Sequence, residues 1–192
     1  MNYKNVITFI LAGGKGERLY PLTKDRAKPA VPFGGSYRII DFSLSNAINS
    51  EFKRIYILTQ YKSFSLQRHI REGWNILSRE LGEFIEVVPA QQRIGEDWYL
   101  GTADSIFQNL YILEREKPEY VLILSGDHVY KMDYTKMLNL HIQKKADLTI
   151  SVFEVNKEEA SRFGVLKVDN EYRVIDFVEK PQVPFTLPDD SS

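Results

Sequence analysis

The chain contains no cysteine, which excludes disulfide bonds, thiolate metal ligands and cysteine nucleophiles. This absence is consistent with a reducing compartment, and we expect a cytoplasmic protein. Long apolar runs are absent too, because no stretch approaches the roughly 18 residues of a membrane helix. The short apolar run at residues 6–12 leads directly into glycines and charges without a plausible cleavage site, so it is interpreted as a buried strand rather than a signal peptide.

The chain also lacks an excess of charge of one sign. Its 25 basic and 26 acidic side chains give a formal net charge of -1. A global positive field for nucleic acid is therefore missing, and neither a nucleic acid nor a membrane is expected as a partner. Any binding of anions must come from a local cluster of basic side chains.

What is present predicts an α/β fold. Short β-branched runs alternate with segments of helical period, which is typical of a Rossmann-like, mostly parallel sheet flanked by helices. The expected strands cover residues 6–11, 54–59, 84–88, 120–124 and 147–153, and the expected helices cover 41–49, 63–72, 102–116 and 133–145. Residues 164–169 and 173–178 are expected to form a hairpin. In such sheets ligands bind at the carboxyl ends of the strands.

The helix expected at 102–116 has the clearest pattern. Thr102 is placed to cap it. One apolar stripe is predicted on its buried face, formed by Ala103, Ile106, Phe107, Leu110 and Leu113.

At the C-terminal end of the chain, residues 182–192 are rich in Pro, Asp and Ser and have no core-forming pattern. They are interpreted as a tail that follows one domain spanning residues 1–181.

A glycine-rich loop follows the first strand. Gly13, Gly14 and Gly16 allow close approach of the backbone to a ligand and suit phosphate oxygens. The loop matches neither a P-loop nor a dinucleotide fingerprint, which would need a third glycine where Leu19 stands. Basic side chains crowd the segment that follows: Lys15, Arg18, Lys24, Arg26 and Lys28. They would neutralise a triphosphate, although a glycine turn beside a solvated charged loop is the alternative.

Two short segments carry further candidates. Asp127 follows the most apolar strand and is well placed to hold Mg²⁺, with a helix or turn cap as the alternative. His128 is interpreted as structural, and His69 and His141 are expected to lack partners and function. Glu179 and Lys180 end the last expected strand, where they would contact a sugar phosphate or form a simple surface pair.

Several segments in order resemble one family. They are Leu11-Ala-Gly-Gly-Lys-Gly-Glu-Arg-Leu19, Arg26-Ala-Lys-Pro-Ala-Val-Pro-Phe-Gly-Gly35, Tyr37-Arg-Ile-Ile-Asp-Phe42, Leu44-Ser-Asn46, Pro89-Ala-Gln-Gln92, Trp98-Tyr-Leu-Gly-Thr-Ala-Asp104, Ser125-Gly-Asp-His128 and Phe177-Val-Glu-Lys-Pro181. The first is similar to the signature of sugar-phosphate nucleotidylyltransferases, with Glu17 in place of the usual threonine. Together they resemble the glucose-1-phosphate adenylyltransferases within that family.

The resemblance implies a role for each matching position. Arg18, Lys28 and Asp127 would be catalytic, with Asp127 as a ligand of Mg²⁺. The ATP site would contain Leu11, Gly13, Gly14, Gly16 and Gln91. The glucose-1-phosphate site would contain Tyr99, Gly164, Glu179 and Lys180. Gln60 and Trp98 match positions that link regulatory and substrate sites in the family, whereas Asp25 stands where some bacterial members carry an activator-binding lysine, which puts that regulation in doubt.

The implied reaction joins ATP to glucose 1-phosphate, giving ADP-glucose and pyrophosphate for glycogen or starch synthesis. The sugar phosphate would attack the α-phosphorus directly, so no protein nucleophile is needed. Family members are about twice as long, with a second acidic metal ligand and a C-terminal left-handed β-helix that supports homotetramers. We therefore expect an incomplete catalytic domain that turns over poorly alone. A related enzyme using UTP, dTTP or GTP, or a non-catalytic binding module, are the alternatives.

Overall fold

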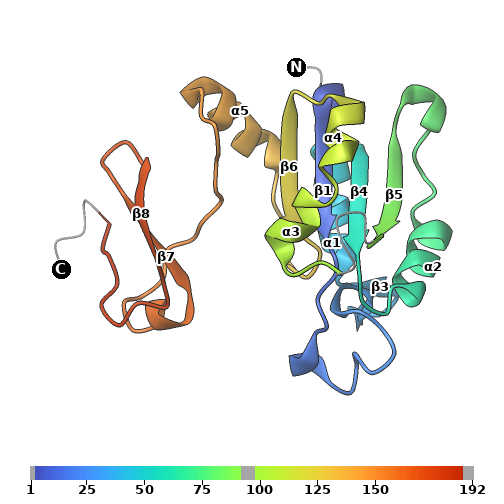
Figure 1. Ribbon diagram of the computed structural model, residues 1–192, viewed down its shortest axis with the longest axis horizontal. Coiled ribbons are helices and arrows are strands. Elements are labelled where there is room, and N and C mark those ends of the chain that lie inside the picture. The colour runs from blue at the N-terminus through green and yellow to red at the C-terminus, as the bar shows by residue number, and fades with distance from the viewer. Residues whose placement is uncertain (1–2, 92–97, 188–192) are drawn as a thin grey trace. The chain divides into compact units, whose positions relative to one another are not determined.

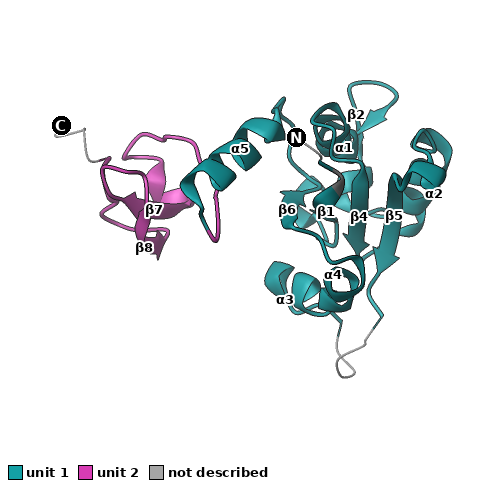
Figure 2. Cartoon of the chain, turned by 90° about the horizontal axis from the view of Figure 1, so that it is seen from above, with its two compact units in different colours: residues 1–146 teal, residues 147–192 magenta. Residues whose placement is uncertain are grey.

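The computed structural model describes residues 3–91 and 98–187. The chain divides into two units, residues 1–146 and residues 147–192, and each is described by itself (Figure 2). The expectation of one domain over 1–181 was made from sequence pattern alone, and the division at 146 falls within it.

Four parallel strands form the centre of the first unit (Figure 1). They are β1 (Val6–Leu11), β4 (Arg54–Thr59), β5 (Phe84–Pro89) and β6 (Tyr120–Ser125). Their order is β5-β4-β1-β6, with Ile10 of β1 in register with Ile57 of β4 and Leu124 of β6. These strands and the α/β class are confirmed. Because the strands are parallel, the loops after β1, β4 and β6 meet at one edge of the sheet.

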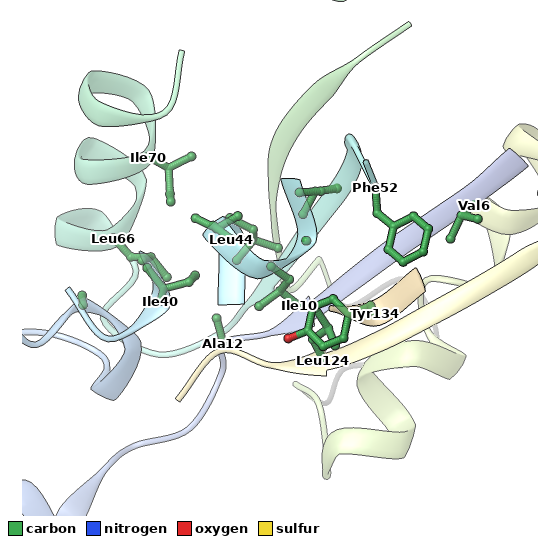
Figure 3. Close-up of a cluster of buried hydrophobic side chains, with 14 residues drawn as sticks. Val6, Ile10, Ala12, Ile40, Leu44, Phe52, Leu66, Ile70, Leu124 and Tyr134 are labelled. Atoms are coloured by element: carbon green, nitrogen blue, oxygen red, sulfur yellow. The ribbon is translucent and has the colours of Figure 1, made fainter. Parts of the chain in front are cut away.

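Helices cover both faces of this sheet. Side chains of α1 (Ile40–Asn49), α2 (Phe64–Gly73) and the start of α5 (Tyr134–Lys144) pack on the face that carries Val6 and Ile10 (Figure 3). The opposite face, with Ile7 and Phe9, packs against Ile112 of α4 (Leu110–Glu116) and is flanked by α3 (Thr102–Phe107). None of the helices in the described part of the chain has the length and apolarity of a membrane span.

Short segments complete the described structure. The first unit also has η1 (Tyr3–Asn5), η2 (Glu17–Leu19), η3 (Lys28–Ala30), η4 (Arg79–Leu81) and the small pair β2 (Pro32–Phe33) and β3 (Tyr37–Arg38). The second unit has η5 (Ala160–Arg162) and the antiparallel pair β7 (Gly164–Val168) and β8 (Val174–Glu179), which confirms the expected hairpin.

The prediction of one helix over 102–116 is wrong, because the chain breaks between α3 and α4 at Gln108 and Asn109. Both side chains are buried, and Asn109 donates to the carbonyl of Ser105, a local bond that competes with the regular helical pattern. The predicted apolar stripe is also wrong in part, since Phe107 is 56% exposed. Thr102 is not the cap: Gly101 holds that position.

The prediction of a strand over 147–153 is wrong as well. The segment has no regular secondary structure, and Leu148 and Val152 are 73% and 66% exposed. Alternating apolar residues favour a strand only where a neighbouring strand supplies hydrogen bonds and a surface to pack on. Within the described residues, no strand pairs with this segment.

Among the described residues, two buried side-chain oxygens of the sheet lack a hydrogen-bond partner, Oγ1 of Thr8 in β1 and Oγ1 of Thr59 in β4, and either can be removed without changing the shape of the core. The Oγ1 of Thr8 is fully buried in β1 and makes no hydrogen bond. We expect Thr8→Val to raise the free energy of unfolding by about 1 kcal/mol, because an unpaired buried hydroxyl costs about that much. Chemical denaturation measures the change.

Thr23→Val is the matched control for this prediction. The Thr23 hydroxyl donates to the carbonyl of Gly16 at 2.9 Å, so its removal should lower stability. A lower unfolding free energy for Thr8→Val than for the unmodified chain would contradict the prediction.

Candidate functional site

A pocket of about 810 Å³ lies at the carboxyl ends of β1, β4 and β6. Three loops supply most of its wall. The lining residues are 11–19 from the end of β1 onward, Tyr99, Gly101, Thr102 and Ser105 before and within α3, and Ser125 and Asp127 from the end of β6 onward. Leu58, Gln60, Lys28 and Pro29 complete the lining. The pocket therefore occupies the position where open parallel sheets bind ligands.

The glycine loop, residues 12–16, depends on glycine at one position above all. Gly16 has φ of 68°, in the left-handed region, and a Cβ added there would lie 2.8 Å from the Cβ of Lys28. Gly14 differs, since an added Cβ would meet nothing within 4 Å. Gly16 thus lets the loop pass directly beside Lys28, while Gly14 faces open space.

Lys28 lies in η3, and two hydrogen bonds from Arg38 of β3 connect that turn to the start of helix α2. Arg38 donates through Nη1 to the carbonyl of Ala30 at 3.2 Å and to Oγ of Ser65 at 2.7 Å. Burial and the nearby positive charges of Arg26 and Arg68 lower the pKa of Arg38 from its usual value. The backbone that carries Lys28 is therefore anchored from outside the pocket.

Three of the five clustered basic residues line the pocket: Lys15, Arg18 and Lys28. Lys24 and Arg26 are not part of the lining. The carbonyls of Thr23 and Lys24 instead accept hydrogen bonds from Lys62 Nζ, which ties this part of the chain to the segment after β4. Fewer basic side chains therefore line the pocket than cluster in the sequence.

Asp127 pairs directly with Lys28 at the wall of the pocket. Lys28 Nζ lies 2.7 Å from Oδ2 of Asp127, and Ser125 Oγ donates to Oδ1 at 2.5 Å. Partial burial opposes ionisation of the carboxyl group, but the hydrogen bonds from Lys28 and Ser125 outweigh it and lower the pKa of Asp127. The carboxylate is therefore ionised at neutral pH. It does not cap helix α5, whose N-cap is Asp133.

The oxygen donors at this position fit a Mg²⁺ ion shared with phosphate. The described residues contain no group of three or more His, Asp or Glu side chains that could hold a metal by themselves. Mg²⁺ is commonly held through one or two carboxylates plus substrate phosphates and water. Asp127, a single carboxylate that lines the pocket, suits that mode of binding.

Tyr99 and Gln60 form one wall. Asn109 donates to the Tyr99 hydroxyl at 2.8 Å, and Gln60 Nε2 donates to the Tyr99 carbonyl at 3.3 Å. Burial raises the pKa of Tyr99 despite the opposing bond from Asn109, so the phenol stays neutral. The break between α3 and α4 places Asn109 where it can hold this ring.

The structure brings nine of the predicted site residues together around one pocket. They are Leu11, Gly13, Gly14, Gly16, Arg18, Lys28, Gln60, Tyr99 and Asp127. Gln91 and Trp98 are exposed and are not part of its lining. They flank residues 92–97, which lie outside the described part of the chain.

Three predicted residues belong to the second unit and lie at one end of its hairpin. Gly164 is in register with Glu179, and Lys180 N donates to the carbonyl of Phe163 at 2.9 Å. Lys180 Nζ lies 3.2 Å from Glu179 Oε1. Because a Cβ on Gly164 would come within 2.7 Å of the Phe177 ring, glycine is required at this position for packing.

Sequence reasoning missed polar contacts between segments far apart in the chain. His69 was expected to lack a partner, but its Nε2 lies 2.6 Å from Oδ1 of buried Asp41, which also accepts from Trp74 Nε1 at 2.8 Å. His141 was expected to lack one as well, but its ring packs edge-on against Tyr120. The only sequence signal for Ser125 was its place in the segment before Asp127.

A second hollow, of about 630 Å³, lies near the amino ends of β4 and β5. Its charged side chains largely neutralise one another: Lys53 pairs with Glu51 at 2.8 Å, and Arg54 pairs with Glu116 at 2.6 Å. It also lies away from the edge of the sheet where ligands bind. The pocket at the carboxyl ends is therefore the candidate site.

A parallel sheet with a glycine loop and basic side chains at its carboxyl ends is typical of α/β proteins that bind phosphate-bearing ligands. The sequence model of the family described as Nucleotidyl transferase matches residues 7–187. The chain belongs to this family.

The curated relatives that match this chain include several glucose-1-phosphate adenylyltransferases. The chain is 58% identical over 188 residues to a glucose-1-phosphate adenylyltransferase of Rhodopirellula baltica, covering 97% of this chain and 42% of the relative. It is 57% identical over 187 residues to glucose-1-phosphate adenylyltransferase 2 of Vibrio vulnificus, covering 97% and 46%, and 59% identical over 187 residues to the Methylobacillus flagellatus protein, covering 97% and 44%. The chain spans less than half the length of these relatives.

Proposed function

We propose that the chain contributes to a glucose-1-phosphate adenylyltransferase, which transfers the adenylyl group of ATP to glucose 1-phosphate and releases pyrophosphate. The observation that carries the proposal is the Lys28–Asp127 pair beside the glycine loop, in a chain 55% to 59% identical to proteins that bear this name. ADP-glucose as a product would serve glycogen or starch synthesis.

The pocket residues support a direct displacement. An oxygen of the sugar phosphate forms a bond to the α-phosphorus of ATP while the bond from that phosphorus to the bridging oxygen of pyrophosphate breaks. Arg18 and Lys28 would neutralise charge on the phosphates, and backbone N–H groups of the glycine loop would orient them. Mg²⁺ held by Asp127 would supply further charge neutralisation when bound. A phosphate attacks without a protein nucleophile, so alignment carries much of the catalysis.

The second unit contains three of the residues that we propose bind glucose 1-phosphate. Glu179 would accept hydrogen bonds from sugar hydroxyls, and Lys180 would contact the sugar phosphate, with Gly164 in register beside them. In the same proposal, residues 1–181 act as one catalytic domain. Gln91 contacts the adenine base of ATP, and Gln60 and Trp98 couple regulatory and substrate sites. A cytoplasmic location and assembly into homotetramers belong to the proposal as well.

A pyrophosphate-release assay with glucose 1-phosphate and each of ATP, UTP, dTTP and GTP tests the function. We expect pyrophosphate release, from this chain or a longer chain that contains it, with ATP in preference to the other three nucleotides. Preference for another nucleotide would favour a different sugar nucleotide as product. Binding of ATP without release in any chain that contains these residues would favour a non-catalytic binding module.

Arg18→Ala tests the assignment of the phosphate site. Arg18 lines the pocket from η2, so its loss should weaken ATP binding at least tenfold, which corresponds to about 1.4 kcal/mol. Isothermal titration with ATP measures the change. Arg79→Ala is the matched control, because Arg79 is an exposed side chain of η4 outside this pocket. Equal ATP affinity in Arg18→Ala, the control and the unmodified chain would refute the assignment.

A further inference from the structure

Asp127 is held through both of its carboxylate oxygens, and the two contacts differ in kind. Oδ2 meets Lys28 Nζ from another loop, whereas Oδ1 accepts the hydroxyl of Ser125, two residues earlier in the chain. Lys28 and Ser125 both line the ligand pocket, so both contacts of the carboxylate lie at its wall. The Ser125 contact anchors Oδ1 to the end of β6.

Ser125 is itself fixed by two neighbouring elements. Ser43 of α1, which is buried, donates through Oγ to the carbonyl of Ser125 at 2.8 Å. On the other side, Gly126 N donates to the carbonyl of Leu11 at 2.9 Å. The fit is close, because a Cβ on Gly126 would lie 3.1 Å from that same carbonyl oxygen. The peptide that joins Ser125 to Gly126 is therefore held between α1 and β1.

We infer that Ser125 is a positioning residue for Asp127: its hydroxyl holds Oδ1 so that Oδ2 faces Lys28 and the bound ligand. The inference rests on the proposed function, because it assigns to Asp127 a cation shared with nucleotide phosphate. Without the Ser125 hydroxyl, the carboxylate keeps the hydrogen bond from Lys28 on Oδ2 and only the longer, 3.9 Å contact of Oδ1 with His128 Nε2. The side chain can then turn about its Cα–Cβ bond with the ammonium, and a cation must bind an oxygen that is no longer held in place.

Removal of a hydrogen bond to a charged group should weaken binding of the shared cation by about tenfold. The direct probe is Mn²⁺, whose binding to the full chain in the presence of ATP is measured by electron paramagnetic resonance. Ser125→Ala should lower Mn²⁺ affinity about tenfold, and Ser125→Thr, which keeps the hydroxyl, should restore most of it. Ser63→Ala is the matched control, since that hydroxyl contacts Gln67 outside the pocket.

Crystal structures of the unmodified chain, Ser125→Ala and Ser125→Thr supply a readout that does not depend on a ligand. We expect the Asp127 carboxylate to leave its position in Ser125→Ala and to keep it in Ser125→Thr. An unchanged carboxylate in Ser125→Ala would overturn the inference, as would Mn²⁺ affinity equal to that of the Ser63→Ala control. Failure of the unmodified chain to bind Mn²⁺ with ATP would count against the proposed function, while the crystal structures would still decide the role of Ser125.

Discussion

Asp127→Asn is expected to reduce formation of ADP-glucose by at least about 100-fold, measured on these residues or on a longer chain that contains them. The amide has the same shape and can still accept the hydrogen bond from the Ser125 hydroxyl. It has no charge, however, to hold a cation or to pair with Lys28 Nζ, which lies 2.7 Å from Oδ2 of Asp127 in the unmodified chain. The loss should appear mainly in kcat, because charge neutralisation matters most in the transition state.

The same substitution should hardly change the melting temperature. The side chains of Lys28 and Asp127 are 34% and 32% exposed, and ion pairs with that access to water contribute at most about 1 kcal/mol. Asp133→Ala gives the opposite pattern and serves as control: Asp133 caps α5, so its loss should cost about 1 kcal/mol of stability and leave turnover intact. A large fall in melting temperature with near-normal turnover in Asp127→Asn would show that this carboxylate is structural.

The sheet could be predicted because its signal is local. β1 and β6 are continuous apolar runs, which is typical of parallel strands buried between helices, and their parallel direction brings the loops that follow them to one edge. That argument places the glycine loop and Asp127 at the same edge of the sheet, but it does not give the strand order that makes them neighbours. It could not supply the contact itself, since Lys28 and Asp127 are 99 residues apart in sequence.

The features that sequence reasoning missed depend on partners from distant segments. The bond from Ser43 to Ser125 spans 82 residues, and nothing near either serine signals it. His69 looked unpartnered on its helix because Asp41 is 28 residues away. Likewise, the apolar pattern over 102–116 could not reveal that buried Asn109 would bind the Tyr99 hydroxyl and interrupt the helix.

Substitution of Gly16 should have the largest effect on the loop, because two independent costs coincide there. A side chain at φ of 68° adopts the left-handed region, which costs on the order of 1 kcal/mol for a residue other than glycine. The added Cβ would also lie 2.8 Å from the Cβ and 3.5 Å from the Cα of Lys28. The backbone must therefore move, and Lys28 must move with it.

We expect Gly16→Ala to lower the free energy of unfolding by about 2 kcal/mol and to weaken ATP binding more than tenfold, measured by denaturation and titration calorimetry. Gly14→Ala is the control for stability, because it has open space around the new Cβ and should change stability by no more than about 0.5 kcal/mol. The two variants together distinguish a loop that needs the backbone geometry of Gly16 from a turn that needs only flexibility. If the three glycines act only as a flexible turn, both variants should behave alike. Equal stability in the two variants, with ATP affinity retained in Gly16→Ala, would mean that Lys28 and the loop can move apart without weakening ATP binding. The assignment of this loop to the phosphates would then fail.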